Sequence, residues 1–183
     1  MNVDPAKLLD AAAFAADKHS RQRRKDAAAS PYINHPLAVA RILAAEAGVR
    51  DEDLLLAALL HDTVEDTATS FAELERLFGA RVRQIVGEVT DDKSLPKATR
   101  KNLQVEHAAR ASDAAKLLKI SDKICNVRDI THHPPADWSA ARKTEYLAWA
   151  KTVVAGCRGI NAVLDKLFDA ALTAAGTLPE ARE

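Results

Sequence analysis

Seven consecutive apolar residues, from Leu54 to Leu60, constrain the fold of this chain more than any other segment. Asp51 lies just upstream and is of a type that commonly caps the N-terminus of a helix. A helix that is apolar almost all round is buried on most of its sides. The sequence therefore predicts a central helix that is enclosed by other elements.

The composition favours helices as these surrounding elements. The chain has 37 alanines and 20 leucines, both strong helix formers, but only 6 glycines and 4% aromatic residues. Scarce glycine and few aromatic residues argue against a sandwich or a barrel. We therefore expect an all-α fold, a single helical bundle of about eight to ten helices over residues 1–183, with its core at about residues 5–172.

Capping residues and chain breakers indicate where these helices begin and end. Helix starts are expected at Asp4–Pro5, Asn34–Pro36, Asp51, Ser70, Asp113 and Ser139. Helix ends or breaks are expected at Gly48, Gly79, His132–Pro135 and Gly156–Gly159, and a polar connection at Asp91–Lys97.

Overall charge and cysteine usage exclude several classes of protein. The 183 residues include 26 basic and 26 acidic side chains, so no overall positive charge favours nucleic acid. No segment approaches the roughly 20 apolar residues of a membrane span, and the N-terminus lacks the features of a secretory signal. Two cysteines, Cys125 and Cys157, do not make a disulfide framework. We expect a cytoplasmic protein that binds neither membrane nor nucleic acid, of undetermined oligomeric state.

The end of the apolar run carries ionisable residues that need a partner. His61 and Asp62 follow Leu60 directly, and Glu65 and Asp66 come four residues after them. If the helix continues, each pair shares one face, and three carboxylates lie close together. A divalent cation would relieve their repulsion, although contact with water would satisfy an isolated His-Asp pair equally well.

Two further residues complete a candidate ligand set for such a cation. His35 lies at a predicted helix start, and Asp122 lies on the helix that begins at Asp113. Together with His61 and Asp62 they offer two imidazoles and two carboxylates. This mixed nitrogen and oxygen set suits Mn²⁺ or Fe²⁺ better than Mg²⁺, and Zn²⁺ remains an alternative.

Three blocks of the chain resemble a known family. They are His19–Ala40, Ala57–Thr67 and Lys119–Asp129. They resemble the HD-domain metal-dependent phosphohydrolases, and more closely the RelA/SpoT hydrolase domain. The Val89–Lys93 segment and the overall length are similar to its stand-alone form, the small alarmone hydrolases and metazoan SpoT homologues.

The resemblance implies an activity and assigns site residues. It implies release of pyrophosphate from the 3′ position of ppGpp or pppGpp, giving GDP or GTP, with Mn²⁺ as the usual metal. The implied ligands are His35, His61, Asp62 and Asp122, and the implied catalytic carboxylates are Glu65 and Asp66. Their acid and base roles stay open. Too few residues follow the last expected helix for a synthetase domain, so we expect degradation without synthesis.

Basic residues are expected to guide an anionic substrate to this acidic site. The segment from Asp51 to Asp92 holds 11 acidic and 3 basic residues, so the remainder of the chain is basic. Arg21–Lys25 contains four cations, and the resemblance matches Arg24 and Lys25 to nucleotide-contacting positions. It also places Asn126 and Tyr146 at the nucleotide. A second basic set (Lys93, Lys97, Arg100, Lys101) either meets the pyrophosphate or forms an ordinary charged surface.

Two other functions remain open at this stage. One is an HD phosphohydrolase acting on another phosphorylated nucleoside, such as a deoxynucleotide or the 2′-phosphate of NADPH, because one fold hosts many substrates. The other is a catalytically silent helical signalling module with a structural metal. The Glu65–Asp66 pair beside the ligands argues against the silent module.

Overall fold

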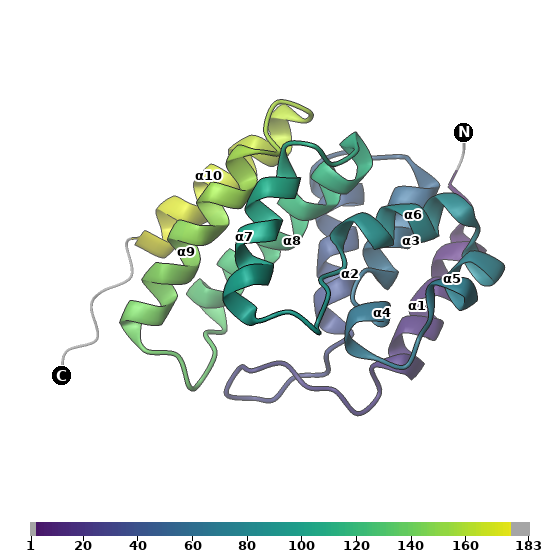
Figure 1. The fold of residues 1–183 in the computed structure, drawn as a ribbon, viewed down its shortest axis with the longest axis horizontal. Coiled ribbons are helices and arrows are strands. Elements are labelled where there is room, and N and C mark those ends of the chain that lie inside the picture. The colour runs from purple at the N-terminus through teal and green to yellow at the C-terminus, as the bar shows by residue number, and fades with distance from the viewer. Residues whose placement is uncertain (1–2, 177–183) are drawn as a thin grey trace.

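The apolar run forms the centre of the structure, as predicted. In the computed structural model, which describes residues 3–176, helix α3 (Glu52–Leu60) has every residue from Leu54 to Leu60 buried. Helices α1, α2, α6 and α8 pack around it (Figure 1). The described residues form helices and no strand, apart from isolated bridges between extended residues, which confirms the all-α prediction.

The remaining helices follow the expected boundaries closely. They are α1 (Pro5–Lys18), α2 (Asn34–Arg41), α4 (Thr63–Asp66), α5 (Phe71–Phe78), α6 (Ala80–Val89), α7 (Lys97–Ala108), α8 (Asp113–His132), α9 (Ala140–Ala155) and α10 (Ala162–Gly176). The side chains of Asp4, Asp51, Ser70 and Ser139 each accept a hydrogen bond from a backbone N–H of the first turn that follows. The same N-cap interaction, by Ser112, starts α8.

Two local features differ from the expected helices. A π-helical turn, Ile42–Glu46, ends the second helix before Gly48, whose φ of +70° permits the change of direction. The prediction that His61, Asp62, Glu65 and Asp66 share one continuous helix is wrong. Helix α3 ends at Leu60, His61 and Asp62 form a turn, and the short helix α4 follows.

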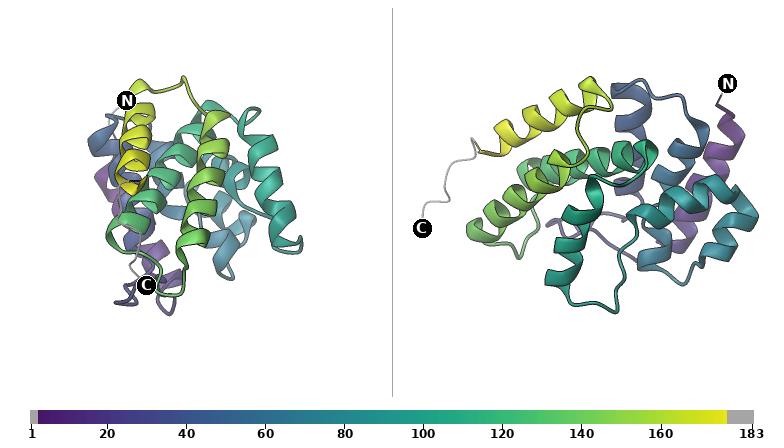
Figure 2. Two further views of the ribbon diagram at one scale, coloured as in Figure 1. Left: turned by 90° about the vertical axis from the view of Figure 1, so that its left-hand side faces the viewer. Right: turned by 45° about the horizontal axis from the view of Figure 1, so that its top comes forward.

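Helix α8 lies between two groups of helices. In Figure 1, helices α9 and α10 lie to the left of α8 and helices α1, α3, α5 and α6 to its right, and the left panel of Figure 2 views the molecule from the side of α9 and α10. Helix α10 packs directly on α8. Within the described residues, no helix is long and apolar enough to cross a membrane.

Three connecting segments meet at one edge of the bundle. Residues 19–33, 90–96 and 133–139 lie together at the lower edge of Figure 1. The backbone N–H of Ala136 donates to the carbonyl of Lys25, and a bridge joins Asp26 to Pro135. This edge holds the predicted site residues.

Candidate functional site

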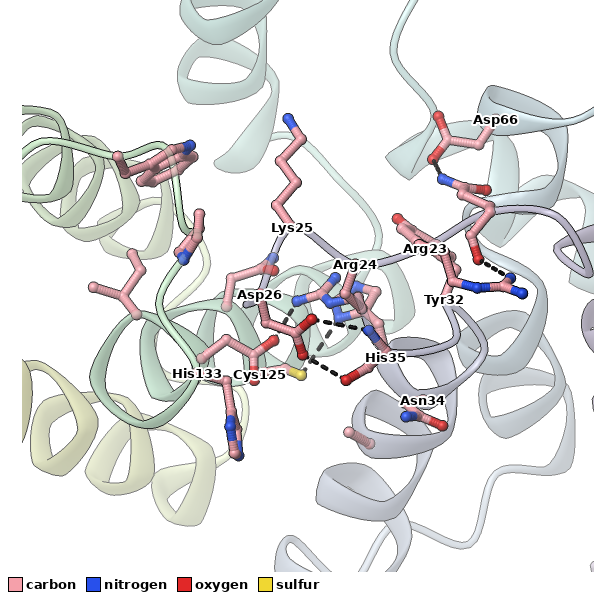
Figure 3. Close-up of a pocket in the computed structure, with 18 of the residues that line it drawn as sticks. Arg23, Arg24, Lys25, Asp26, Tyr32, Asn34, His35, Asp66, Cys125 and His133 are labelled. Atoms are coloured by element: carbon pink, nitrogen blue, oxygen red, sulfur yellow. Dashed lines mark hydrogen bonds and ion pairs between the residues drawn. The ribbon is translucent and has the colours of Figure 1, made fainter. Parts of the chain in front are cut away.

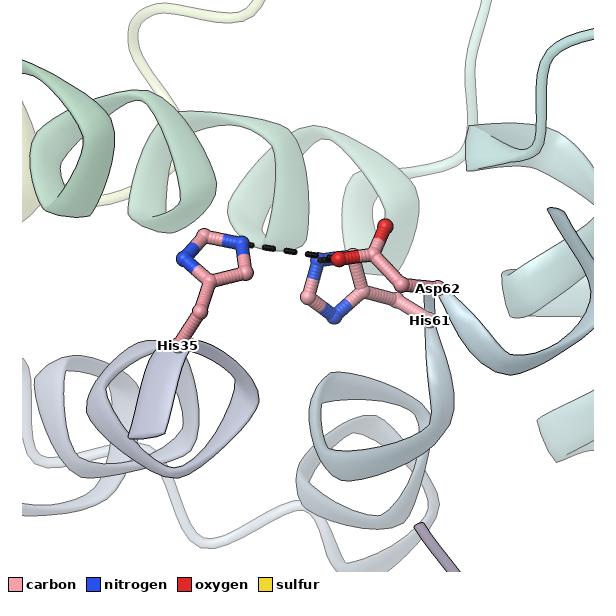
Figure 4. Close-up of side chains that lie close together, drawn as sticks. All are labelled: His35, His61 and Asp62. Carbon is pink, nitrogen blue, oxygen red and sulfur yellow. Dashed lines mark ion pairs between the residues drawn. The ribbon is translucent and has the colours of Figure 1, made fainter. Parts of the chain in front are cut away.

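Four side chains from three parts of the chain converge beneath this edge. His35 comes from the first turn of α2, and His61 and Asp62 come from the turn after α3 (Figure 4). Asp122 comes from the middle of α8. His35 Nε2 lies 3.1 Å from Asp122 Oδ1 and 3.6 Å from Asp62 Oδ2. His61 Nε2 lies 3.2 Å from Asp62 Oδ2 and 3.9 Å from Asp122 Oδ1. The structure thus brings the four predicted ligands together.

The imidazole of His61 is oriented for binding a cation. Its Nδ1 lies 2.8 Å from the carbonyl oxygen of Ala58, so this nitrogen carries the proton and donates it. Its Nε2 is buried and has no partner with hydrogen-bonding geometry among the described residues. A buried nitrogen lone pair without a donor is costly unless a cation or a ligand satisfies it. The residues present therefore fit a divalent cation.

The electrostatics of the cluster agree with this fit. Burial lowers the pKa of His61, but the carboxylates of Asp62 and Asp122 outweigh it and raise that pKa to about 9. Burial raises the pKa of Asp62, but the two imidazoles hold it well below its usual value. The cluster therefore favours a positive charge between its imidazoles and carboxylates.

A second layer of side chains holds the ligands in place. The Tyr32 hydroxyl donates to Asp62 Oδ2 at 2.7 Å. On Asp122, Lys123 Nζ donates to Oδ2 and Asn126 Nδ2 donates to Oδ1, both at 2.7 Å. Cys125 Sγ lies 3.4 Å from His35 Nδ1. Such partners fix the orientation of metal ligands and tune their basicity.

A pocket of about 810 Å³ opens beside the cluster and is called the main pocket here (Figure 3). The predicted site residues His35, Glu65, Asp66, Arg24, Lys25, Asn126 and Tyr146 all line it. His61, Asp62 and Asp122 lie deeper, next to His35. The predicted ligands, carboxylates and substrate-binding residues thus belong to one concave site.

Glu65 and Asp66 are neighbours in sequence but have different surroundings. Burial is the main cause that raises the pKa of Glu65, and nearby carboxylates add to it. Glu65 Oε2 accepts the backbone N–H of Asp91 at 3.0 Å. Asp66 instead accepts hydrogen bonds from Gln22 Nε2, at 2.9 Å, and from Lys93 Nζ. The Glu65 carboxyl is suited to carry a proton, and Asp66 is a carboxylate held by donors.

The basic residues are arranged along the opening of the main pocket. Arg24 pairs with Asp129, and its guanidinium lies 5.7 Å from the centre of the Tyr32 ring. Lys25 is exposed and points away from the cluster in Figure 3. It also lines a smaller side pocket of about 240 Å³, together with Lys97, Arg100 and Lys101. Three members of the predicted second basic set therefore gather there, whereas Lys93 pairs with Asp66.

Tyr146 belongs to a row of aromatic rings between the two pockets. Its ring centre lies 5.5 Å from that of Trp138 and 5.4 Å from that of Trp149. Trp138 lines both pockets, and its indole Nε1 is buried without a described partner. Tyr146 and Trp138 thus offer ring surface at the junction of the pockets.

Sequence reasoning missed three residues of this site. Tyr32 bonds a predicted ligand, Gln22 bonds a predicted catalytic carboxylate, and Trp138 lines the main pocket. Tyr32 lies three residues before His35, within the block that resembles the family. Because Tyr32 lies on the irregular connection between α1 and α2, no periodic pattern in the sequence could predict that its hydroxyl contacts Asp62.

The chain matches a known protein family over most of its length. The family described as HD domain matches residues 11–160, which include every predicted site residue.

Individual relatives are similar over nearly the whole chain. The guanosine-3′,5′-bis(diphosphate) 3′-pyrophosphohydrolase MESH1 of Xenopus tropicalis is 56% identical over 169 residues, covering 92% of this chain and 94% of that protein. The protein of the same name from Homo sapiens is 55% identical over 166 residues, covering 91% and 93%. A solved structure described as a metazoan ortholog of SpoT that hydrolyzes ppGpp superposes with a TM-score of 0.91 at 47% identity, covering 97% of this chain and all of the other.

Proposed function

This chain belongs to the HD-domain family, and we propose that it is a guanosine-3′,5′-bis(diphosphate) 3′-pyrophosphohydrolase, which converts ppGpp to GDP and pyrophosphate. The proposal is carried by one observation. The cluster of His35, His61, Asp62 and Asp122 lies beside a pocket that is also lined by Glu65 and Asp66, whose hydrogen-bond partners differ. Relatives that share more than half of the residues are named for this reaction.

The four clustered side chains are the proposed ligands of a divalent cation, and the donor set suits Mn²⁺. A cation held there would polarise a phosphate oxygen and acidify a water molecule. The donations of Tyr32 to Asp62 and of Asn126 to Asp122 keep both carboxylates turned toward the imidazoles. His35, His61, Asp62 and Asp122 would thus hold the cation beside the main pocket, which His35 also lines.

Glu65 is the proposed proton acceptor for the attacking water. Its pKa is raised by burial, and Oε1 has Arg100 Nη1 at 4.0 Å as its nearest described cation. The water oxygen bonds to the phosphorus that carries O3′, and the P–O3′ bond breaks. One proton of the water goes to Glu65 and is passed on through solvent to O3′, which leaves as the 3′-hydroxyl of GDP.

Asp66 is proposed to position the water rather than to carry a proton. Gln22, which also lines the pocket, and Lys93 donate to its carboxylate and fix its orientation. This division assigns the roles that the sequence left open. Arg24, Lys25 and Asn126 would contact the nucleotide, and Tyr146 would contact its ribose or base.

A substrate panel tests the proposal. Purified protein is incubated with Mn²⁺ and ppGpp, pppGpp, NADPH or dAMP, and the products are separated by ion-exchange chromatography. We expect GDP or GTP from the first two substrates. Phosphate release from NADPH or dAMP alone would favour the alternative phosphohydrolase. No product from any substrate, with metal bound, would favour the silent module.

A further inference from the structure

A third cavity lies away from the proposed active site and is called the rear pocket here. It has a volume of about 420 Å³ and shares no lining residue with the main pocket. Its walls come from the end of α6, the segment after it, α7 and the first half of α8: Gly87–Asp92, Arg100, Leu103, Gln104, His107, Arg110, Ala111 and Lys119. Asp91, Arg100 and Gln104 also line the side pocket, and Asp91 and Arg100 lie beside Glu65, but no step of the proposed reaction uses this cavity.

Lys119 is the unusual residue of the rear pocket. Only 6% of its surface is exposed, yet its ammonium has no hydrogen bond or ion pair within the part of the chain that the structure describes. Burial and the nearby cation Lys123 lower its pKa, while Cys157, Asp91 and Asp122 act in the opposite direction. The ammonium thus keeps three N–H donors free in the cavity that it lines, and they are available to an anion from outside the chain.

Other basic side chains of the rear pocket also carry donors without a partner, although Arg100 Nη1 lies 4.0 Å from Glu65 Oε1. Arg110 and His107 are exposed and form no side-chain hydrogen bond or ion pair with any described residue. The Nε of Arg100 is buried and lacks a described partner as well. Three side chains besides Lys119 therefore point unused donors at the same cavity.

The acidic residues of the pocket, in contrast, already accept hydrogen bonds. Asp91 Oδ2 accepts from Gln104 Nε2 at 2.8 Å, and Asp92 Oδ1 accepts from the N–H of Ser94 at 2.9 Å. Glu88 Oε2 accepts from the N–H of Ser112 at 2.7 Å, while its Oε1 is buried and unpartnered. The hydrogen-bonding groups of the pocket that lack a partner are thus mainly donors, together with one acceptor, Glu88 Oε1.

We propose that the rear pocket is a second anion site that binds a phosphate group through Lys119, Arg110 and His107. A hydrogen phosphate matches the unused groups, because its oxygens accept from the cations and its hydroxyl can donate to Glu88 Oε1. The same chemistry is offered by free phosphate, free pyrophosphate or the diphosphate of a nucleotide.

Nuclear magnetic resonance of the histidine rings separates this site from the main pocket. His107 lines the rear pocket and His133 lines the main pocket, so each reports on one site. The protein, loaded with diamagnetic Mg²⁺, is titrated with inorganic phosphate, pyrophosphate or GDP. We expect a saturable shift of the His107 ring signals with at least one of these probes.

Lys119→Met should weaken the affinity reported by the His107 ring signals at least tenfold, while the His133 signals should still respond. Lys116→Met, on the same helix but outside the pocket, is the matched control and should bind as the wild type does. If Lys119→Met fails to fold, Arg110→Gln takes its place, because Arg110 is exposed. The same tenfold loss of affinity is expected.

The outcomes also identify the source of the phosphate group. A response to phosphate or pyrophosphate supports recognition of the free anion, whereas a response to GDP alone supports a nucleotide diphosphate. No saturable shift of His107 with any probe would overturn the proposal. An unchanged affinity in folded Lys119→Met would overturn it equally, and neither result depends on the proposed hydrolysis.

Discussion

Glu65 and Asp66 show that adjacent residues of one type can differ in chemistry because their surroundings differ. Glu65 is half-buried near other carboxylates, and its pKa is raised, whereas Asp66 is held by Gln22 and Lys93. Burial disfavours the charged form of a carboxyl, whereas hydrogen-bond donors fix the orientation of a carboxylate. The proposed division of roles rests on this difference.

Glu65→Gln should lower kcat by about 10² or more, because an amide cannot accept the proton of water. Asp66→Asn should also lower kcat, because its amide nitrogen would face two donors. Both variants should bind metal as the wild type does, since neither residue belongs to the four-ligand cluster. Steady-state kinetics with a metal titration checks this, and near-normal rates in both variants would refute the assignment.

The raised pKa of Glu65 predicts how kcat/KM changes on the acid side of the pH profile. A base must be deprotonated to act, so kcat/KM should fall as the pH drops through the pKa of Glu65. That midpoint should lie above 4.5, the ordinary value for this residue. In Glu65→Gln, the residual rate should lack this inflection; an inflection that persists unchanged would assign it to another group.

Tyr32→Phe tests the second layer of the metal cluster. The variant removes the 2.7 Å hydrogen bond to Asp62 and leaves the ring, so metal affinity should fall by about 10-fold or more. Competition with a chelating dye measures this affinity. Tyr146→Phe is the control, because its ring lies farther along the pocket and no described residue bonds its hydroxyl. Equal affinities in the two variants would contradict a positioning role for Tyr32.

The residue scale also shows what the sequence could predict. The clustering of the four proposed ligands was predictable, because each lies at a helix start, after an apolar helix or on a helix, in a combination of residue types that favours a cation. Tyr32 and Gln22 were not, because both lie on an irregular connection whose path depends on contacts with residues 133–139 and with α4. Local periodicity carries no information about such contacts.

At the scale of elements, the end of α3 at Leu60 separates a helix that forms the core from a turn that carries site residues. Helix α3 is buried along its length, and the turn at His61–Asp62 aims these side chains at α2 and α8 rather than along α3. The sequence reasoning expected one continuous helix because His61–Asp66 contains no glycine or proline. The tertiary contacts of His61 and Asp62 override this local preference.

Asp51→Ala tests the start of α3. Asp51 accepts the N–H of Leu54 and pairs with Arg81, so its loss should cost about 0.5–2 kcal/mol of unfolding free energy. Asp53→Ala is the matched control: it also removes a partner of Arg81 but no helix cap, so it should cost less. Urea unfolding at neutral pH measures both, and equal costs would contradict the capping argument.

The stability that Asp51→Ala loses relative to the wild type should depend on pH. The hydrogen bond from Arg81 is the main cause that lowers the pKa of Asp51 below 3.8. A lowered pKa in the folded state means that the stabilisation is present above 3.8 and is lost as the pH falls through the lower, folded value. The difference between Asp51→Ala and the wild type should therefore shrink below pH 3.8.

At the scale of the whole molecule, neutrality conceals a separation of charge. The acidic segment from Asp51 to Asp92 supplies proposed ligands and catalytic carboxylates, while cations from other segments line the main and side pockets. Such a rim attracts a polyanionic substrate to a site that binds a cation.

Lys25→Gln should raise KM for ppGpp several-fold with little change in kcat, because Lys25 lines both pockets at their rim. Lys151→Gln, an exposed lysine of α9 outside every pocket described here, is the charge-matched control and should leave KM unchanged. Salt should raise the wild-type KM and reduce the difference between Lys25→Gln and the wild type, because ions screen exposed charges. Equal KM values for the two variants at low salt would contradict the steering role.

The central claim is that one metal-dependent site releases the 3′-diphosphate of ppGpp intact. Phosphorus NMR of the products tests it most directly, with protein first stripped by a chelator and then supplied with Mn²⁺, which is removed again before the spectrum is recorded. The account predicts no product without metal, and GDP and pyrophosphate in equal amounts once metal is restored. Orthophosphate as the first product, or turnover that persists without metal, would contradict it.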